Sequence, residues 1–223
     1  MRIARVSGSV RRSDHLSAMA HIRAMQPRPE DLPIGDVVHR IVLLTEGLRR
    51  FWSDPHGWAP LAAAQLLSRS RLDWQVSLSR CLSLWTEEPA TADASGQLIL
   101  GWANLGSLVE GSMKLFLSAW YETYRRDEDY AIVRRGQTQD PDGLMLEAMR
   151  QYYRKRIWDE TWDEWVQHIQ ARRNAIHAFR DRDLGTREEL LHDIRMYLSF
   201  LRYVNARLPY PGDEYMPSEV GSA

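Results

Sequence analysis

The sequence predicts an all-α fold, and three observations predict it. Apolar residues recur at helical spacing in successive segments from Val37 to Val204. No run of alternating apolar and polar residues is present, so a sheet is not expected. There is also no glycine-rich phosphate loop, which argues against a dinucleotide-binding α/β fold. With 223 residues, 44% of them hydrophobic and 26% charged, the chain is typical of one globular domain.

The first third of the chain predicts an arm followed by two helices. Residues 1–35 are polar and end in three prolines, so we expect an N-terminal arm with one short helix near Asp14–Met25. The all-α domain is predicted over residues 36–208. Its first helix runs from Asp36 to about Trp52, and after the turn SDPHGWAP a second runs from Leu61 to about Thr86. Their apolar stripes include Val37, Ile41, Leu44, Leu48, Leu66, Leu67, Trp74, Leu78, Leu82 and Trp85.

The middle of the chain predicts one long apolar helix, over about residues 95–126, after the break EEPATADASG. Its window Leu98–Trp120 is long enough to cross a bilayer. Glu110 and Lys114 lie in the middle of that window, where charges cost a few kcal/mol each in a membrane. Because these residues are four apart, they can pair on one helix face. We therefore expect a buried core helix and no membrane association.

The last third predicts three more helices. The segment DYAIVRRGQTQDPDG is expected to be a loop or a weak strand, followed by helices over Leu144–Trp158 and Thr161–Phe179. Thr186 and Glu189 form a capping box, which opens a final helix to about Leu208. Pro209 and Pro211 are expected to stop this helix, and residues 209–223 are predicted to be a flexible tail.

Charge and cysteine content limit the kind of protein. The net charge of −1 implies no general attraction to nucleic acid, although a local basic patch remains open. The single cysteine, Cys81, excludes an internal disulfide and a multi-cysteine zinc site, and we interpret it as an inert core residue. A cytoplasmic protein without a metal or cofactor is expected. Only Lys114 and Lys155 are lysines among 29 basic residues, which is typical of a GC-rich bacterial genome.

The helix predicted over Thr161–Phe179 carries the residues that suggest chemistry. On a wheel of about 100° per residue, its apolar stripe is centred on Ile169. Arg173 falls inside this stripe, Arg172 falls on one edge, and His177 falls beside Arg173 on the other edge. A buried guanidinium without a partner is very costly, so each arginine needs an acid, an interface or an anionic ligand.

The sequence RRNAIHAF resembles the signature of the HEPN family, whose members are all-α proteins and in many cases ribonucleases. The family motif is an arginine, a polar residue, three further residues and a histidine. Arg172 and His177 match that spacing, whereas the asparagine that often follows the family arginine is here Asn174, after Arg173. The preceding segment SLVEGSMKLFLSAWYETY resembles the HEPN helix that carries a glutamate, here Glu110. The resemblance covers about residues 95–208 and implies a HEPN-type helical bundle with residues 1–90 as an N-terminal extension.

The resemblance implies a metal-independent endoribonuclease, acting as a homodimer in a bacterial toxin or antiviral-defence setting. RNA is then the substrate, and a protein antitoxin or defence partner is compatible with that setting. The residue types fit the chemistry, because a histidine can transfer a proton near neutral pH and an arginine fork can stabilise a phosphorane. The alternative is a catalytically silent HEPN-like module that binds a nucleotide, RNA or a protein partner.

Several residues keep a structural interpretation beside the functional one. Arg172 and Arg173 can pair with acids of neighbouring helices, and His177 can bond a carboxylate at a helix edge. Glu110 can either pair with Lys114 or orient a motif arginine. His168 and His192 are expected to be solvated. The basic cluster after Tyr152 and Tyr153 is either a solvated helix face or an RNA contact; its members are Arg154, Lys155 and Arg156.

Overall fold

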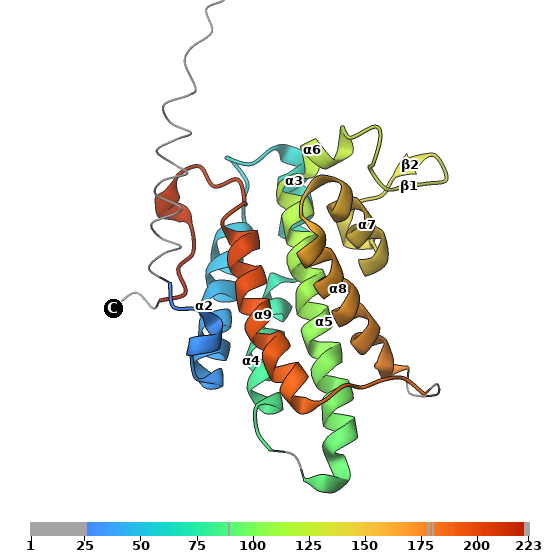
Figure 1. The fold of residues 1–223 in the computed structure, drawn as a ribbon. Coiled ribbons are helices and arrows are strands. Elements are labelled where there is room, and N and C mark those ends of the chain that lie inside the picture. The colour runs from blue at the N-terminus through green and yellow to red at the C-terminus, as the bar shows by residue number, and fades with distance from the viewer. Residues whose placement is uncertain (1–25, 89, 178, 180, 221–223) are drawn as a thin grey trace, which may run out of the picture.

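A computed structural model describes residues 26–220 apart from 89, 178 and 180, and these residues form a helical bundle (Figure 1). The predicted all-α class is confirmed. Within the described part of the chain the only strands are β1 (Val133–Arg134) and β2 (Gln137–Thr138). The short helix predicted near Asp14–Met25 lies outside the described residues. Short 3₁₀ turns lie between the helices and at both ends of the described chain: η1 (Pro29–Asp31), η2 (Leu82–Trp85), η3 (Thr91–Asp93), η4 (Pro141–Gly143), η5 (Asn174–Ile176) and η6 (Asp213–Tyr215).

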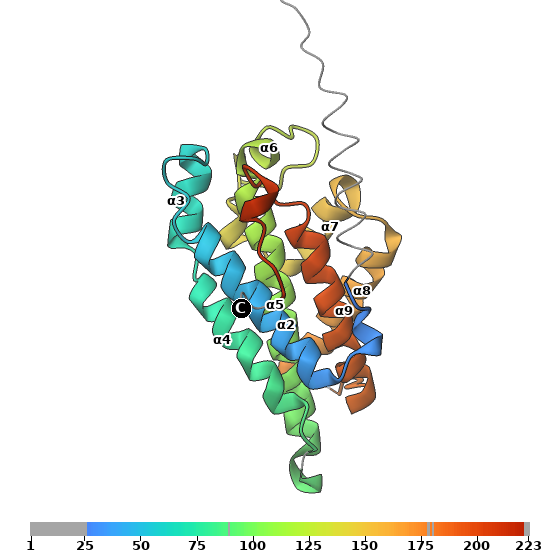
Figure 2. The ribbon, with the colours of Figure 1, turned by 90° about the vertical axis from the view of Figure 1, so that its left-hand side faces the viewer.

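The long helix α5 (Ala94–Ala119) runs through the middle of the bundle, as both views of the ribbon show (Figures 1 and 2). It packs against α3 (Leu61–Arg69), α4 (Leu72–Cys81), α8 (Glu160–Arg173) and α9 (Arg187–Asn205). Because neighbours cover most of its circumference, apolar residues occur on nearly every face. No helix in the described part of the chain has both the length and the apolar character needed to cross a membrane.

The helix α2 (Ile34–Trp52) packs against α4 and α9 on the side of the bundle seen in Figure 2. It begins two residues before the predicted start at Asp36 and ends at the predicted residue. The predicted stripe on this helix is buried, from Val37 to Leu48. Trp52 closes this end of the core, where its ring lies 5.5 Å from that of Tyr210.

Two predicted helices are broken in the structure. The helix predicted over Leu61–Thr86 is split into α3 and α4, because Ser70 has an extended backbone and its hydroxyl donates to the Leu67 carbonyl at 2.5 Å. The helix predicted to about residue 126 is interrupted at Trp120, which separates α5 from α6 (Tyr121–Arg125). At both breaks, Ser70 and Trp120, a residue with a non-helical backbone ends one helix and the next helix begins.

The segment predicted to be a loop or weak strand forms the hairpin of β1 and β2, which projects from the bundle beside α7 (Leu146–Arg156) (Figure 1). Its two turn residues, Arg135 and Gly136, both have positive φ, of 53° and 76°. Positive φ at both positions is the pattern of a type I′ hairpin turn.

Residues 209–220 do not form the flexible tail that was predicted, because they pack against α2 and α9. The side chain of Glu219 is 2% exposed and forms ion pairs with Arg40 at 2.7 Å and with Arg202 at 2.6 Å. The amide of Asn205 also donates to the Pro217 carbonyl at 3.0 Å. Pro209 and Pro211 follow the end of α9 at Asn205, and the buried carboxylate of Glu219 after them attaches the segment to the bundle.

Candidate functional site

The helix α8 ends earlier than the sequence predicts. Its N-terminus is capped by Asp159, whose carboxylate accepts from the Trp162 amide, and its last residue is Arg173 rather than Phe179. The chain then tightens into the turn η5, and His177 follows with a non-helical backbone. The physical reason is burial. Among the described residues that follow Ala175, Ile176, His177 and Phe179 are exposed, so a further helical turn would bury none of them.

Arg173 lies against α5, where the carboxylate of Glu110 forms ion pairs with both Arg173 and Lys114. One guanidinium nitrogen of Arg173 donates to Oε2 of Glu110, and the Lys114 ammonium lies 2.8 Å from Oε1. Burial raises the pKa of Glu110, but the neighbouring Lys114 and Arg173 outweigh it, so the pKa lies below its ordinary value. Glu110 therefore pairs with Lys114, as one of its two interpretations expects, and it also forms an ion pair with Arg173.

The approach of Arg173 to α5 depends on a glycine. A Cβ atom added to Gly106 would lie 2.6 Å from Cδ of Arg173 and 2.9 Å from its Cβ and Cγ. The aliphatic part of Arg173 thus occupies the space that any larger residue at 106 would fill. The side chain of Arg173 still keeps 31% of its surface exposed. Its charge is oriented by Glu110 and remains accessible from solvent.

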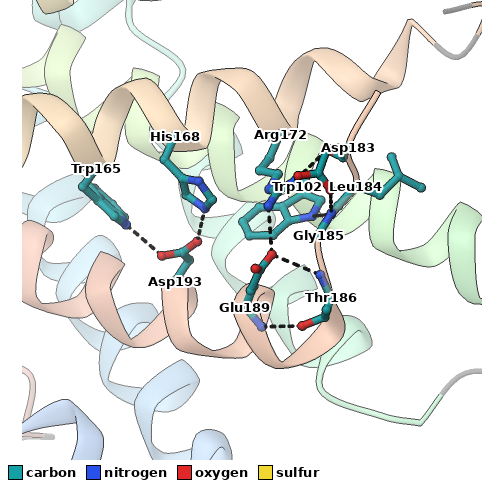
Figure 3. A network of polar contacts seen from close by, with 10 residues as sticks. All are labelled: Trp102, Trp165, His168, Arg172, Asp183, Leu184, Gly185, Thr186, Glu189 and Asp193. Carbon is teal, nitrogen blue, oxygen red and sulfur yellow. Dashed lines mark hydrogen bonds and ion pairs between the residues drawn. The ribbon is translucent and has the colours of Figure 1, made fainter. Parts of the chain in front are cut away.

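Arg172 points to the other side of α8, where Asp183 and Glu189 bind its guanidinium (Figure 3). Its side chain is 11% exposed, with Nη1 2.7 Å from a carboxylate oxygen of Asp183 and Nη2 3.0 Å from Oε2 of Glu189. Nη1 also donates to the Asp183 backbone carbonyl at 2.7 Å. The Arg172 guanidinium, with the Gly185 amide, holds the pKa of the Asp183 carboxyl below its ordinary value. Arg172 therefore ties the segment before α9 to α8.

The same carboxylate of Glu189 completes the start of α9. It accepts from the Thr186 amide at 3.1 Å, while the Thr186 hydroxyl accepts from the Glu189 amide at 3.2 Å. The predicted capping box is thus confirmed. Just before it, Gly185 has a φ of 66°, and an added Cβ would lie 2.0 Å from Glu189 and 2.9 Å from the guanidinium carbon of Arg172. The turn is built around the Arg172–Glu189 pair.

A second polar cluster joins α8 to α9, one helical turn further from η5 (Figure 3). His168 was expected to be solvated, but its Nε2 lies 2.9 Å from the buried carboxylate of Asp193. The other oxygen of Asp193 accepts from the Trp165 indole at 3.0 Å. The sequence does contain a signal for this cluster, since His168 and Arg172 on α8 and Glu189 and Asp193 on α9 are both spaced by four residues. His192, by contrast, is exposed as expected.

The surface around η5 is open. His177 is exposed, and its imidazole makes no hydrogen bond or ion pair with any described residue. Asn174 is half-buried, and its carbonyl accepts from the His177 amide at 3.2 Å. Ile176 is exposed, and Phe179 is 101% exposed, as exposed as in an unfolded chain. Ile176 and Phe179 thus place exposed apolar groups beside the polar groups of this surface.

The basic cluster expected to contact RNA lies at the other end of α8. Arg154, Lys155 and Arg156 are exposed at the end of α7, and α8 is about 20 Å long at 1.5 Å per residue. The tyrosines of the expected basic-aromatic surface, Tyr152 and Tyr153, are buried instead. Arg156 stacks on another tyrosine and pairs with acids; these contacts are with Tyr130 at 4.2 Å, Asp127 at 2.8 Å and Asp129 at 3.4 Å.

The structure therefore brings Glu110, Arg173, Asn174 and His177 to one end of α8 and leaves the basic cluster of α7 at the other. Arg172 lies at the same end of α8 but is directed toward the Asp183–Glu189 segment. Comparisons with protein-family models, with curated proteins and with solved structures find no match for this chain.

Proposed function

We propose that this protein is a metal-independent endoribonuclease of the HEPN type, in which Arg173 binds phosphate and His177 transfers a proton. The observation that carries the proposal is the Glu110–Arg173 pair, which orients a partly exposed guanidinium four residues before an exposed, unpartnered imidazole. Asn174 lies between them and is available to position RNA or the arginine.

Arg173 is better suited than Arg172 to contact RNA. The spacing of the family motif favours Arg172, but the Arg172 guanidinium is almost fully buried among Asp183 and Glu189. Binding a phosphate there would require breaking both ion pairs. Arg173 has one carboxylate partner, which it shares with Lys114, and nearly three times the exposed fraction. A planar guanidinium oriented in this way can bind two phosphate oxygens at once.

The reaction that these groups support needs only RNA. The ribose 2′-hydroxyl attacks the adjacent phosphorus, the bond to the 5′-oxygen breaks, and one proton moves from the 2′-oxygen to the leaving oxygen. His177 takes or gives that proton. Arg173 stabilises the additional negative charge of the phosphorane. The products are a 2′,3′-cyclic phosphate and a 5′-hydroxyl end.

A homodimer supplies what one chain lacks. A single copy carries one such histidine, whereas the reaction is faster when one group accepts a proton as another donates one. The exposed Ile176 and Phe179 offer an apolar surface beside the site for a second copy. By the family resemblance, we propose a bacterial toxin or antiviral-defence effector as the biological setting.

The proposal is tested by incubating the purified protein with total RNA in the presence and absence of EDTA. We expect cleavage in both, with 2′,3′-cyclic phosphate ends on the fragments. Cleavage that strictly requires added magnesium, or fragments with 3′-hydroxyl ends, contradicts the mechanism. If RNA is bound but never cut, the catalytically silent binding module becomes the better account.

A further inference from the structure

A pocket of about 430 Å³ is lined by residues of α3 and α6. These two helices lie together at one end of the bundle (Figure 1). Its walls are α3, both ends of α6, the loop before α3 and the residue before η4. Tyr121 in this pocket follows Glu110 by eleven residues, roughly 16 Å along a helix axis. The pocket is therefore separate from the proposed catalytic residues.

The pocket contains two arginines that form no ion pair with a described carboxylate. The side chain of Arg69 forms no hydrogen bond or ion pair with any residue that the structure describes, and Arg125 lies against the Tyr121 ring, 5.6 Å from its centroid. His56 from the loop before α3 adds an imidazole to the lining. Arginine forks match the geometry of phosphate oxygens, and unneutralised cations that line one cavity favour an anionic ligand.

One acid in the pocket is already engaged by a tyrosine. The Tyr121 hydroxyl donates to Oδ1 of Asp140. Burial and the Asp140 carboxylate together raise the pKa of Tyr121 to about 12, so the hydroxyl stays protonated at neutral pH and keeps donating. The second oxygen of Asp140 accepts no hydrogen bond from the described residues. It can accept one from a hydroxyl or amino group of a ligand.

We propose that this pocket binds the phosphate monoester of a nucleoside, with the phosphate on Arg69 and Arg125 and a ribose hydroxyl or base amino group on Asp140. The volume lies within the range of small-molecule sites. Ala62 and Leu66 give the pocket an apolar wall for the uncharged part of the ligand. The same chemistry occurs in a free mononucleotide and at the 5′-phosphorylated end of an RNA strand.

Calorimetric titration of the full chain tests the proposal. The probes are adenosine 5′-monophosphate, adenosine, and a hexanucleotide of 2′-O-methyl RNA with either a 5′-phosphate or a 5′-hydroxyl end; the methyl groups prevent cleavage. Arg69→Gln and Arg125→Gln should each weaken binding of the phosphorylated probes at least tenfold. Arg126→Gln is the matched control. It lies next to Arg125, outside the pocket and paired with Glu122, so its affinity should stay within twofold of the wild type.

Binding of adenosine 5′-monophosphate but not adenosine supports a free nucleotide as ligand. Binding of only the 5′-phosphorylated strand supports an RNA end. The proposal is overturned if no phosphorylated probe binds at millimolar concentration, or if removing the phosphate leaves the affinity unchanged. It is also overturned if Arg126→Gln weakens binding as much as Arg69→Gln and Arg125→Gln do. These titrations do not depend on RNA cleavage, so they stand or fall separately from the proposed ribonuclease activity.

Discussion

Nη2 of Arg172 lies 3.0 Å from Oε2 of Glu189, the same oxygen that accepts the Thr186 amide in the capping box of α9. The pair therefore links the last turn of α8 to the first turn of α9. The neighbouring Arg173 makes its ion pair with α5 instead. Two consecutive arginines thus have different tasks, one structural and one proposed to be catalytic.

The structural task of Arg172 predicts that Arg172→Ala destabilises the fold. Its removal deletes a largely buried side chain together with its hydrogen bond to the Asp183 carbonyl, and we expect a loss of about 1 kcal/mol in the free energy of unfolding. Urea denaturation measures this loss. The control is Arg182→Ala, an exposed arginine without a partner among the described residues, which should change stability by less than about 0.5 kcal/mol. Equal stability of both variants contradicts the assignment.

The contact between Gly106 and Arg173 predicts opposite effects for two alanine substitutions in α5. Gly106→Ala places a methyl group against the Arg173 side chain and should cost about 1–3 kcal/mol. Gly96→Ala has nothing within 4 Å of the added carbon and should stabilise the helix by about 0.4–1 kcal/mol. Thermal denaturation of both variants checks the signs. RNA cleavage should fall only in Gly106→Ala, and a stable, fully active Gly106→Ala protein would count against the contact.

The ion pairs of Glu110 predict a pH dependence of stability. Its pKa in the folded protein lies below 4.5, the ordinary value, so its contribution to stability is fully present above about pH 4.5 and is lost as the pH falls through the folded-state pKa. Glu110→Gln should therefore be less stable than the wild type at pH 7, and the difference should shrink below about pH 4.5. Denaturation curves at pH 7, 5, 4 and 3 measure this. A difference that is constant with pH excludes the ionised carboxylate as its source.

The buried Glu219 predicts that the C-terminal segment contributes to stability. Glu219→Ala leaves the largely buried guanidiniums of Arg40 and Arg202 without a carboxylate, and breaking a buried pair in this way costs about 3–5 kcal/mol. Guanidinium denaturation measures the loss. Glu214→Ala, an exposed residue of the same segment, should be nearly neutral. A neutral Glu219→Ala variant would show that residues 209–220 are not held by this contact.

The local parts of the fold could be predicted from the sequence. The all-α class follows from the periodicity. The capping box of Thr186 and Glu189 could be predicted because its two partners lie within four residues, and the structure confirms it. The end of α8 could not be predicted in this way. Ile176 continues the helical period, but it is exposed in the structure, and periodicity carries no information about where the neighbouring surface ends.

The partners of the charged residues were the less predictable part. The wheel places Arg172 and Arg173 about 100° apart and requires an acid for each, but it does not identify Glu189 or Glu110, which lie 17 and 63 residues away. The same holds for Glu219, which pairs with Arg40 across 179 residues. Such pairs depend on how the helices pack, and one sequence without that packing leaves several acids equally suitable.

The central claim, that His177 transfers a proton in RNA cleavage, is tested most directly by comparing the cleavage rates of wild type, His177→Ala and His192→Ala under single-turnover conditions with EDTA. His192 is also an exposed histidine, located on α9, so its removal controls for a general effect of losing an imidazole. We expect His177→Ala to lose about 10²–10⁴ in rate with an unchanged melting temperature, and His192→Ala to keep the wild-type rate. Undiminished cleavage by His177→Ala would contradict the account.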